Sequence, residues 1–246
     1  MLQQTQAERV VPHYRRFLAA FPSVDTLASA GAREVLARWS GLGYNRRALR
    51  LQAAARRIAE HGWPTTVEGL RRLPGVGPYT AAAEACFAFG AQAPTLDTNL
   101  RRVLSRWEGK ELRGVRLEEA ARRALGSGRA AEWNQAVMDL GAKICRSQRP
   151  RCDRCPVRAW CRAPGLALGP RPHTPFQGSR RQARGAILRA LLQGAGPEVG
   201  ELASLTGLDA RRVRAALGAL EQDGLLTEQG ATGSPGSWPA SPGPRR

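Results

Sequence analysis

The chain has 246 residues, with 38 Lys or Arg against 20 Asp or Glu, which gives a formal net charge of +18. Hydrophobic residues make up 42% of it, enough for a packed core, and no apolar run approaches the roughly 18–20 residues that a membrane span requires. The arginine excess predicts a polyanionic partner such as nucleic acid, because basic side chains displace counterions from phosphates. A GC-rich genome is the alternative source of that excess, since only Lys110 and Lys143 are lysines.

Residues 1–163 are predicted to form an all-α domain, because strand-like alternation is scarce and Ala, Leu and Arg dominate. Short Gly/Pro breaks, such as Gly41-Leu42-Gly43 and Gly62-Trp63-Pro64, separate the helical segments. Many short helices joined by short loops are typical of this fold class. The expected helices span residues 6–21, 26–29, 32–40, 45–60, 67–72, 79–89, 97–107, 116–125 and 130–143.

Residues 164–184 are rich in Pro and Gly and predict a linker, and the Gly/Pro/Ser-rich tail at 229–246 is expected to be disordered. Residues 185–228 between them predict a second, smaller helical unit. Its order of elements resembles a winged-helix module, which would contact DNA through arginines on its last helix. Packing of a small helical bundle on the preceding domain is the alternative. The expected helices lie at 186–192, 199–205 and 210–223, the wing begins at 223–227, and the arginines are Arg211, Arg212 and Arg214.

The segment Leu73-Pro74-Gly75-Val76-Gly77 lies between two predicted helices. Gly75 and Gly77 allow a tight turn and a close approach to a ligand, and the helix that follows offers free backbone N–H groups. This is the helix-hairpin-helix signature, and it predicts that Gly75, Val76 and Gly77 bind a DNA phosphate. The alternative is an ordinary glycine turn that binds no ligand.

Asp97 comes after this hairpin and directly before an amphipathic helix. On its own it would be interpreted as a helix N-cap. A hairpin, an aspartate and a cysteine loop in this order resemble the pattern of helix-hairpin-helix DNA glycosylases, which remove a flipped-out base. That resemblance implies that the Asp97 carboxylate stabilises the positive charge that develops on the sugar during glycosidic cleavage.

Four of the five cysteines crowd into residues 145–161, which favours a metal site over disulfides. The spacing by itself suits either a structural zinc or an iron–sulfur cluster. The spacing also resembles the 4Fe–4S loop of the endonuclease III superfamily, which implies that a 4Fe–4S cluster is the cofactor. The fifth cysteine, Cys86, is expected to lie in the core. The expected metal ligands are Cys145, Cys152, Cys155 and Cys161.

Several segments together resemble the adenine DNA glycosylase (MutY) family over residues 1–165. They are residues 1–6, 39–44, 73–80, 96–99 and 133–141. The resemblance implies removal of adenine mispaired with 8-oxoguanine or guanine in double-stranded DNA during base-excision repair. It implies that Gln3, Gln4 and Tyr44 probe the base stack. It also implies that Tyr79 and Asn99 line the catalytic pocket beside Asp97.

Two details bear on the reaction. Related bifunctional enzymes carry a Schiff-base Lys where this chain has Tyr79, so a monofunctional hydrolase is expected.

In this family a catalytic Glu lies two residues before the Met that matches Met1, so the printed sequence does not contain it. General acid help is worth about 10²–10⁴ in rate, and we expect the chain as printed to bind DNA with little turnover.

The resemblance also implies a localisation and an oligomeric state, and it leaves two other functions open. A bacterial, cytoplasmic, nucleoid-associated monomer with no membrane partner is expected. A glycosylase with another mismatch specificity is one alternative, and a non-catalytic DNA-binding protein on a glycosylase scaffold is another.

Overall fold

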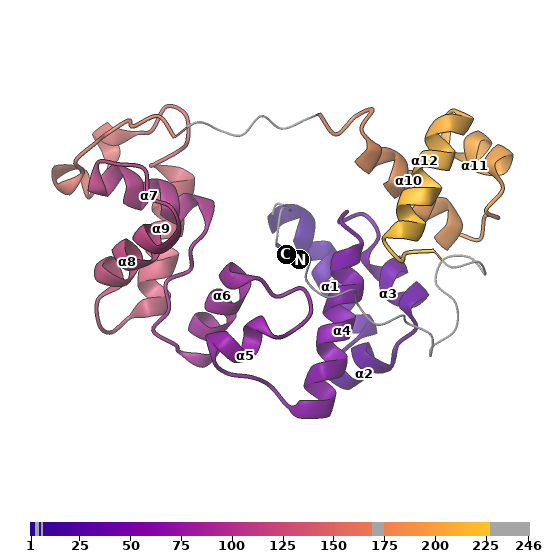
Figure 1. Ribbon diagram of the computed structural model, residues 1–246, viewed down its shortest axis with the longest axis horizontal. Coiled ribbons are helices and arrows are strands. Elements are labelled where there is room, and N and C mark those ends of the chain that lie inside the picture. The colour runs from indigo at the N-terminus through magenta and orange to yellow at the C-terminus, as the bar shows by residue number, and fades with distance from the viewer. Residues whose placement is uncertain (3–4, 6, 169–174, 227–246) are drawn as a thin grey trace. The chain divides into compact units, whose positions relative to one another are not determined.

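The computed structural model describes residues 1–2, 5, 7–168 and 175–226 of the chain (Figure 1). Every regular element within these residues is a helix, which confirms the all-α prediction. The described helices include none that is long and apolar enough to cross a membrane. Contacts between residues group Met1–Gly62 with the described residues after 173, and Trp63–Pro172 forms a second unit.

The first unit begins with four helices, whose predicted positions are confirmed to within two residues. The chain turns between the first two of them at Ser23, whose hydroxyl accepts from the Thr26 N–H and caps the second helix. An aromatic cluster fills the space between the helices, with the ring of Phe17 4.9 Å from Phe21 and 6.0 Å from Trp39. The helices are α1 (Ala7–Ala20), α2 (Val24–Ser29), α3 (Ala32–Trp39) and α4 (Arg46–His61).

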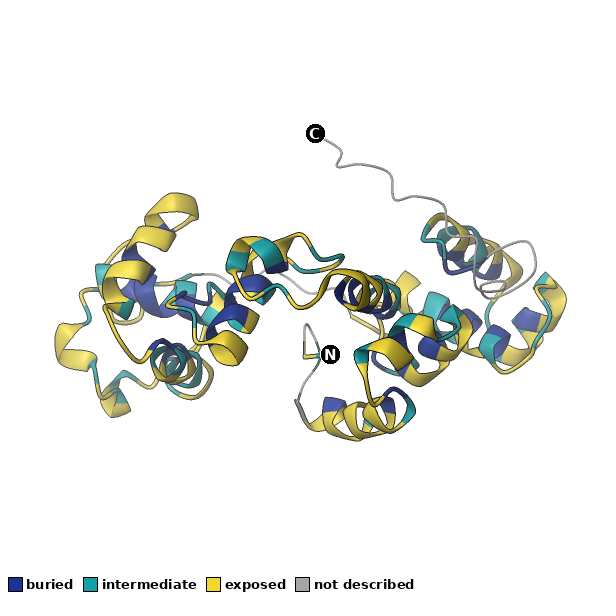
Figure 2. Ribbon diagram, turned by 90° about the horizontal axis from the view of Figure 1, so that it is seen from below, coloured by how far each residue is buried: buried dark blue, intermediate teal, exposed yellow. Residues whose placement is uncertain are grey.

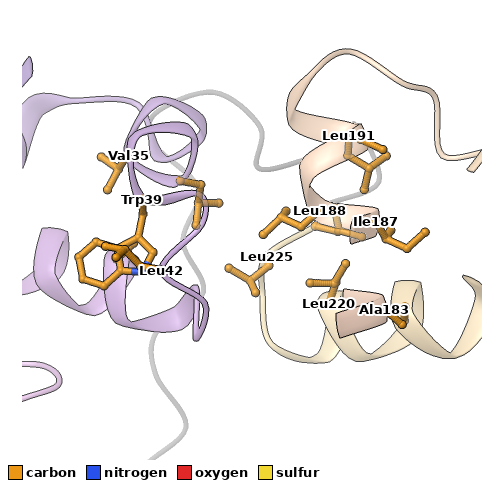
Figure 3. Close-up of a cluster of buried hydrophobic side chains, with 14 of the residues drawn as sticks. Val35, Trp39, Leu42, Ala183, Ile187, Leu188, Leu191, Leu220 and Leu225 are labelled. Carbon is orange, nitrogen blue, oxygen red and sulfur yellow. The ribbon is translucent and has the colours of Figure 1, made fainter. Parts of the chain in front are cut away.

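Three later helices pack on these four and share their core. They are α10 (Arg180–Leu192), α11 (Val199–Thr206) and α12 (Ala210–Gln222). Leu188 and Leu225 lie on the side that faces Trp39 and Leu42 (Figure 3), and all four side chains are buried in one hydrophobic cluster. The Arg33 guanidinium adds hydrogen bonds to the Leu191 and Leu192 carbonyls at the end of α10. These three helices therefore pack on the four before them, and the winged-helix contact with DNA stays a prediction.

The predicted linker at 164–184 is too long at its C-terminal end, because α10 already begins at Arg180. The physical reason is an N-cap: the Ser179 hydroxyl accepts from the Gln182 N–H, after Gly178 turns the chain at a φ of 76°. The arginines that follow are good helix formers. Residues 227–228 of the predicted unit and the tail at 229–246 lie outside the described residues.

The second unit contains, in its described residues up to 168, five α-helices and two short 3₁₀ helices. Leu100, Val103 and Leu104 recur at helical spacing on α7 and are buried against Leu117 of α8 and Val137 of α9. Such spacing leaves the opposite helix faces exposed, and Figure 2 shows buried and exposed segments alternating along the helices. The elements are α5 (Val67–Arg71), α6 (Pro78–Phe89), α7 (Thr98–Glu108), α8 (Gly114–Leu125), α9 (Ala130–Lys143), η1 (Cys152–Arg154) and η2 (Arg158–Trp160).

Candidate active site

The predicted hairpin joins α5 to α6. Gly75 has a φ of 80°, a conformation that L side chains rarely adopt, and the Val76 N–H closes the turn on the Leu73 carbonyl at 3.2 Å. Gly77 is the N-cap residue of α6 and Pro78 opens the helix. The glycines are exposed, whereas Val76 is partly buried in the small core of the hairpin. The turn therefore presents backbone N–H groups to solvent, as a phosphate site requires.

Asp97 is the N-cap of α7, which confirms the N-cap interpretation of this residue. One carboxylate oxygen accepts from the Leu100 N–H at 2.6 Å, and the other accepts from the Asn99 Nδ2 amide at 3.0 Å. The side chain is only partly buried. The cap thus fixes the direction of a carboxylate that remains accessible.

Tyr79 lies at the start of α6 in the same unit. Burial, followed by the charge of Asp97, raises the pKa of its hydroxyl. The hydroxyl is 3.9 Å from the Met138 sulfur on α9. At neutral pH Tyr79 is therefore a neutral donor within the field of the Asp97 carboxylate.

Arg102 organises this cluster and was not among the predicted site residues. Its guanidinium donates to Asn99 Oδ1 at 2.7 Å, to the Gly141 carbonyl at 2.6 Å and to the Cys145 carbonyl at 2.7 Å. Gly141 lets α9 approach closely, because a Cβ there would lie 2.6 Å from Asn99 Cβ. Nothing in the sequence separates Arg102 from the many arginines on solvated faces; only its position one turn after Asn99 could have singled it out.

Asn134 on α9 ties the strand-like segment before Asp97 to the helices. It is fully buried, accepts from the Thr95 N–H at 2.8 Å and donates to the Ala93 carbonyl at 2.9 Å. Its amide also donates to the Cys86 sulfur at 3.3 Å. Cys86 is buried on α6, which confirms its predicted core position.

The four remaining cysteines line one cavity at the end of α9. Burial is the main reason that the pKa of the Cys161 thiol is raised, and repulsion from the other three cysteines adds to it. Two backbone hydrogen bonds fasten the end of the loop to α7, from the Arg162 N–H to Trp107 and from the Ala163 N–H to Arg106. The loop thus gathers the four predicted ligands around one space.

Arg106 lies against this cavity with only 2% of its surface exposed. Its guanidinium donates to the carbonyls of Leu166, Arg146 and Ser147 and, at 3.3 Å, to the Cys145 sulfur. In the described part of the chain no carboxylate pairs with it. A buried guanidinium is costly unless its N–H groups are hydrogen-bonded, and these four contacts supply the hydrogen bonds.

The other predicted DNA contacts belong to the first unit. Tyr44 lies in the loop between α3 and α4, is 47% exposed and has a φ of 49°. Gln3 and Gln4 lie outside the described residues. The structure therefore brings together Tyr79, Asp97 and Asn99 in one unit, with the hairpin and the cysteine loop in the same unit.

A glycine hairpin between two helices, a capped aspartate and a four-cysteine loop define a helix-hairpin-helix repair fold. The family model described as "HhH-GPD superfamily base excision DNA repair protein" matches residues 1–125. The adenine DNA glycosylase of Mycolicibacterium smegmatis is 38% identical over 250 residues, which cover 95% of this chain and 83% of that protein. The chain therefore belongs to the HhH-GPD superfamily of base excision DNA repair proteins, among the relatives of adenine DNA glycosylase.

Other relatives match a smaller part of this chain and of their own length. The adenine DNA glycosylase of Mus musculus is 42% identical over 173 residues, which cover 66% of this chain and 34% of that protein. The chain thus spans about a third of the length of the mammalian relatives it matches. A solved structure of a thermostable thymine-DNA glycosylase aligns with a TM-score of 0.62 at 29% identity, covering 65% of this chain and 78% of that one.

Proposed function

We propose that the protein is a monofunctional adenine DNA glycosylase that acts as a monomer on adenine mispaired with 8-oxoguanine or guanine in duplex DNA. The observation that carries the proposal is the fixed carboxylate of Asp97, held by the Leu100 N–H and the Asn99 amide, with the Tyr79 hydroxyl in its field. The similarity to relatives named adenine DNA glycosylase supports the choice of adenine as the base removed.

The geometry supports electrostatic catalysis by Asp97. As the glycosidic bond breaks, positive charge develops on the sugar, and a carboxylate whose direction is already fixed stabilises it without reorganising. The hydrogen bond from Asn99 keeps one carboxylate oxygen oriented, and Tyr79 is placed to donate to a water or to the flipped nucleotide. The hairpin residues Gly75, Val76 and Gly77 are proposed to bind a DNA phosphate through the N–H groups that the turn leaves unused, since the Val76 N–H is bonded to the Leu73 carbonyl.

Hydrolysis without lyase chemistry follows from the residue types. A lyase needs an amine nucleophile, and the hairpin position that carries it in bifunctional relatives is Tyr79 here. Of the two lysines, Lys143 is engaged with Asp139 at 2.9 Å on the same helix. Borohydride should therefore trap no appreciable covalent adduct between the protein and its DNA.

We propose a 4Fe–4S cluster as the group that the cysteine loop holds, with Cys145, Cys152, Cys155 and Cys161 as ligands. Four thiolates would also suit a structural zinc. The spacing of the four cysteines, which resembles that of the 4Fe–4S loop of the endonuclease III superfamily, favours the cluster. The four thiols line a shared cavity with the Arg106 guanidinium against it. The bound cluster would order this arginine-rich loop for DNA docking.

Two measurements test these proposals. Duplexes carrying A:8-oxoguanine, A:G, T:G and A:T pairs should lose adenine in the first two only, detected as cleavage of the adenine strand after the abasic site is treated with alkali. Because the family's general acid precedes the position of Met1, the assay uses the printed chain and one extended by any in-frame codons upstream. Iron and labile sulfide should be present in equal amounts, matching one cubane cluster per chain; a single zinc would contradict the cluster.

A second candidate activity is removal of thymine from mismatches. The likeness to the solved thymine-DNA glycosylase, at 29% identity and a TM-score of 0.62, favours testing it. Preferential cleavage of the thymine strand in the T:G duplex would replace adenine with thymine as the substrate. Binding of all four duplexes without any cleavage by the extended chain would instead support a non-catalytic DNA-binding protein.

A further inference from the structure

The C-terminal helices contact the loop that carries Tyr44. Arg181, in the first turn of α10, donates to the Tyr44 hydroxyl at 3.0 Å. Nearby, Asp223 at the end of α12 pairs with Arg46 at 3.2 Å and also with Arg184. These polar contacts fasten α10 and α12 to the start of α4, beside the shared apolar core (Figure 3). Helices α10 and α12 therefore contact the loop that carries Tyr44 and the start of α4.

Tyr44 is held in a conformation that tyrosine adopts at a cost. Its φ of 49° is in the left-handed region, and it follows Gly43, which has a φ of 70°. The Arg47 guanidinium lies over its ring at 5.6 Å and over the Trp39 ring at 5.3 Å. Such strain persists only where surrounding contacts impose it, and it is concentrated at functional sites. An exposed ring is thus braced at its face by Arg47 and at its hydroxyl by Arg181.

The alternative surface for DNA, on α12, is partly occupied by internal contacts. Arg212 donates to the Gly178 carbonyl at 3.0 Å, so its guanidinium ties α12 to the segment before α10. Arg211 and Arg214 are exposed. The contact that distinguishes this unit is consequently the one to Tyr44 and not an arginine row on α12.

We propose that Arg181 is a positioning residue for Tyr44, through which the C-terminal helices take part in recognising a mispaired base in duplex DNA. The hydrogen bond holds the ring in the direction in which it enters the base stack. The inference rests on the proposed function, because it takes Tyr44 to be the residue that probes the mispair. It assigns to α10–α12 a role in mismatch discrimination that acts through Tyr44.

A double-mutant cycle tests the proposal. Arg181→Ala, Tyr44→Phe and the double variant are compared for binding to an A:8-oxoguanine duplex and to the matched A:T duplex. Arg189→Ala is the control, because Arg189 is exposed on the same helix and its removal costs the same charge. Thermal unfolding checks each fold, and Arg181→Lys, which keeps a donor and the charge, should restore most of the preference for the mispair.

Each single variant should reduce the preference for the mispaired duplex about three- to tenfold, the range expected for one hydrogen bond, and the double variant should be no worse. Arg189→Ala should weaken binding to both duplexes alike. A probe of stacking supports the same point: 2-aminopurine next to the mispair should brighten less with either single variant than with the wild type.

The experiment distinguishes failure of the proposed function from failure of the positioning role of Arg181. A wild-type protein without preference for the mispair overturns the proposed function and this inference together. A wild-type preference that Arg181→Ala leaves intact, or that falls additively in the double variant, overturns only the positioning role. In the additive case Arg181 acts on the mispair preference independently of Tyr44.

Discussion

Asp97 has two roles in the structure, a helix cap and the proposed catalytic carboxylate, and substitutions can separate them. Asp97→Asn keeps an oxygen to accept from the Leu100 N–H, and asparagine is as good an N-cap as aspartate. It removes the negative charge. Asp97→Ala removes the cap, the charge and the acceptor of the Asn99 hydrogen bond.

The magnitudes follow from these contacts. Loss of the cap costs about 1 kcal/mol, so Asp97→Ala should lower the midpoint of thermal unfolding by about 2–4 °C. With Asp97→Asn the new amide group faces the Asn99 amide, and both groups are partly exposed to water. Its cost should therefore stay below about 1 kcal/mol. Base removal should fall by about 10²-fold or more in both variants, since each loses the carboxylate.

Single-turnover base removal from an A:8-oxoguanine duplex, with the upstream-extended chain in excess, measures the effect on catalysis, and thermal unfolding measures the effect on stability. Duplex binding in each variant serves as the control for a correctly formed hairpin. Retention of near wild-type cleavage by Asp97→Asn would reduce Asp97 to a cap and refute the catalytic role. An equal loss of stability in the two variants would refute the argument that the cap needs only an oxygen.

Three further predictions concern the packing around this site. Gly141→Ala should cost about 1–3 kcal/mol in unfolding free energy and reduce base removal, because its Cβ would displace Asn99; a urea denaturation curve like that of the wild type would contradict the close contact. Asn134→Ala should cost about 2–4 kcal/mol, because it leaves the buried Thr95 N–H without its acceptor; the urea midpoint measures this. The raised pKa of Tyr79 predicts stability that is fully present below about pH 10 and is lost as pH rises through the higher folded value. Tyr79→Phe should remove that part of the pH dependence of thermal unfolding, and an unchanged alkaline profile would show that the hydroxyl is not perturbed.

The sequence by itself determined the helices and the local motifs. Apolar residues at helical spacing and Gly/Pro breaks placed every helix of the first 143 residues to within two residues, because these signals are local. Gly75, Asp97 and the cysteine spacing were recognisable for the same reason, since a positive φ, an N-cap and a ligand loop each depend on a few neighbouring residues.

Only the tertiary structure decided which residues act together. Arg102, Arg106 and Asn134 resemble other polar residues on amphipathic helices, and their importance comes from burial against carbonyls and a cysteine far away in the chain. The contact between Arg181 and Tyr44 joins residues 137 positions apart. Such pairings depend on how helices pack, and helical periodicity specifies which face is buried but not which partner it meets.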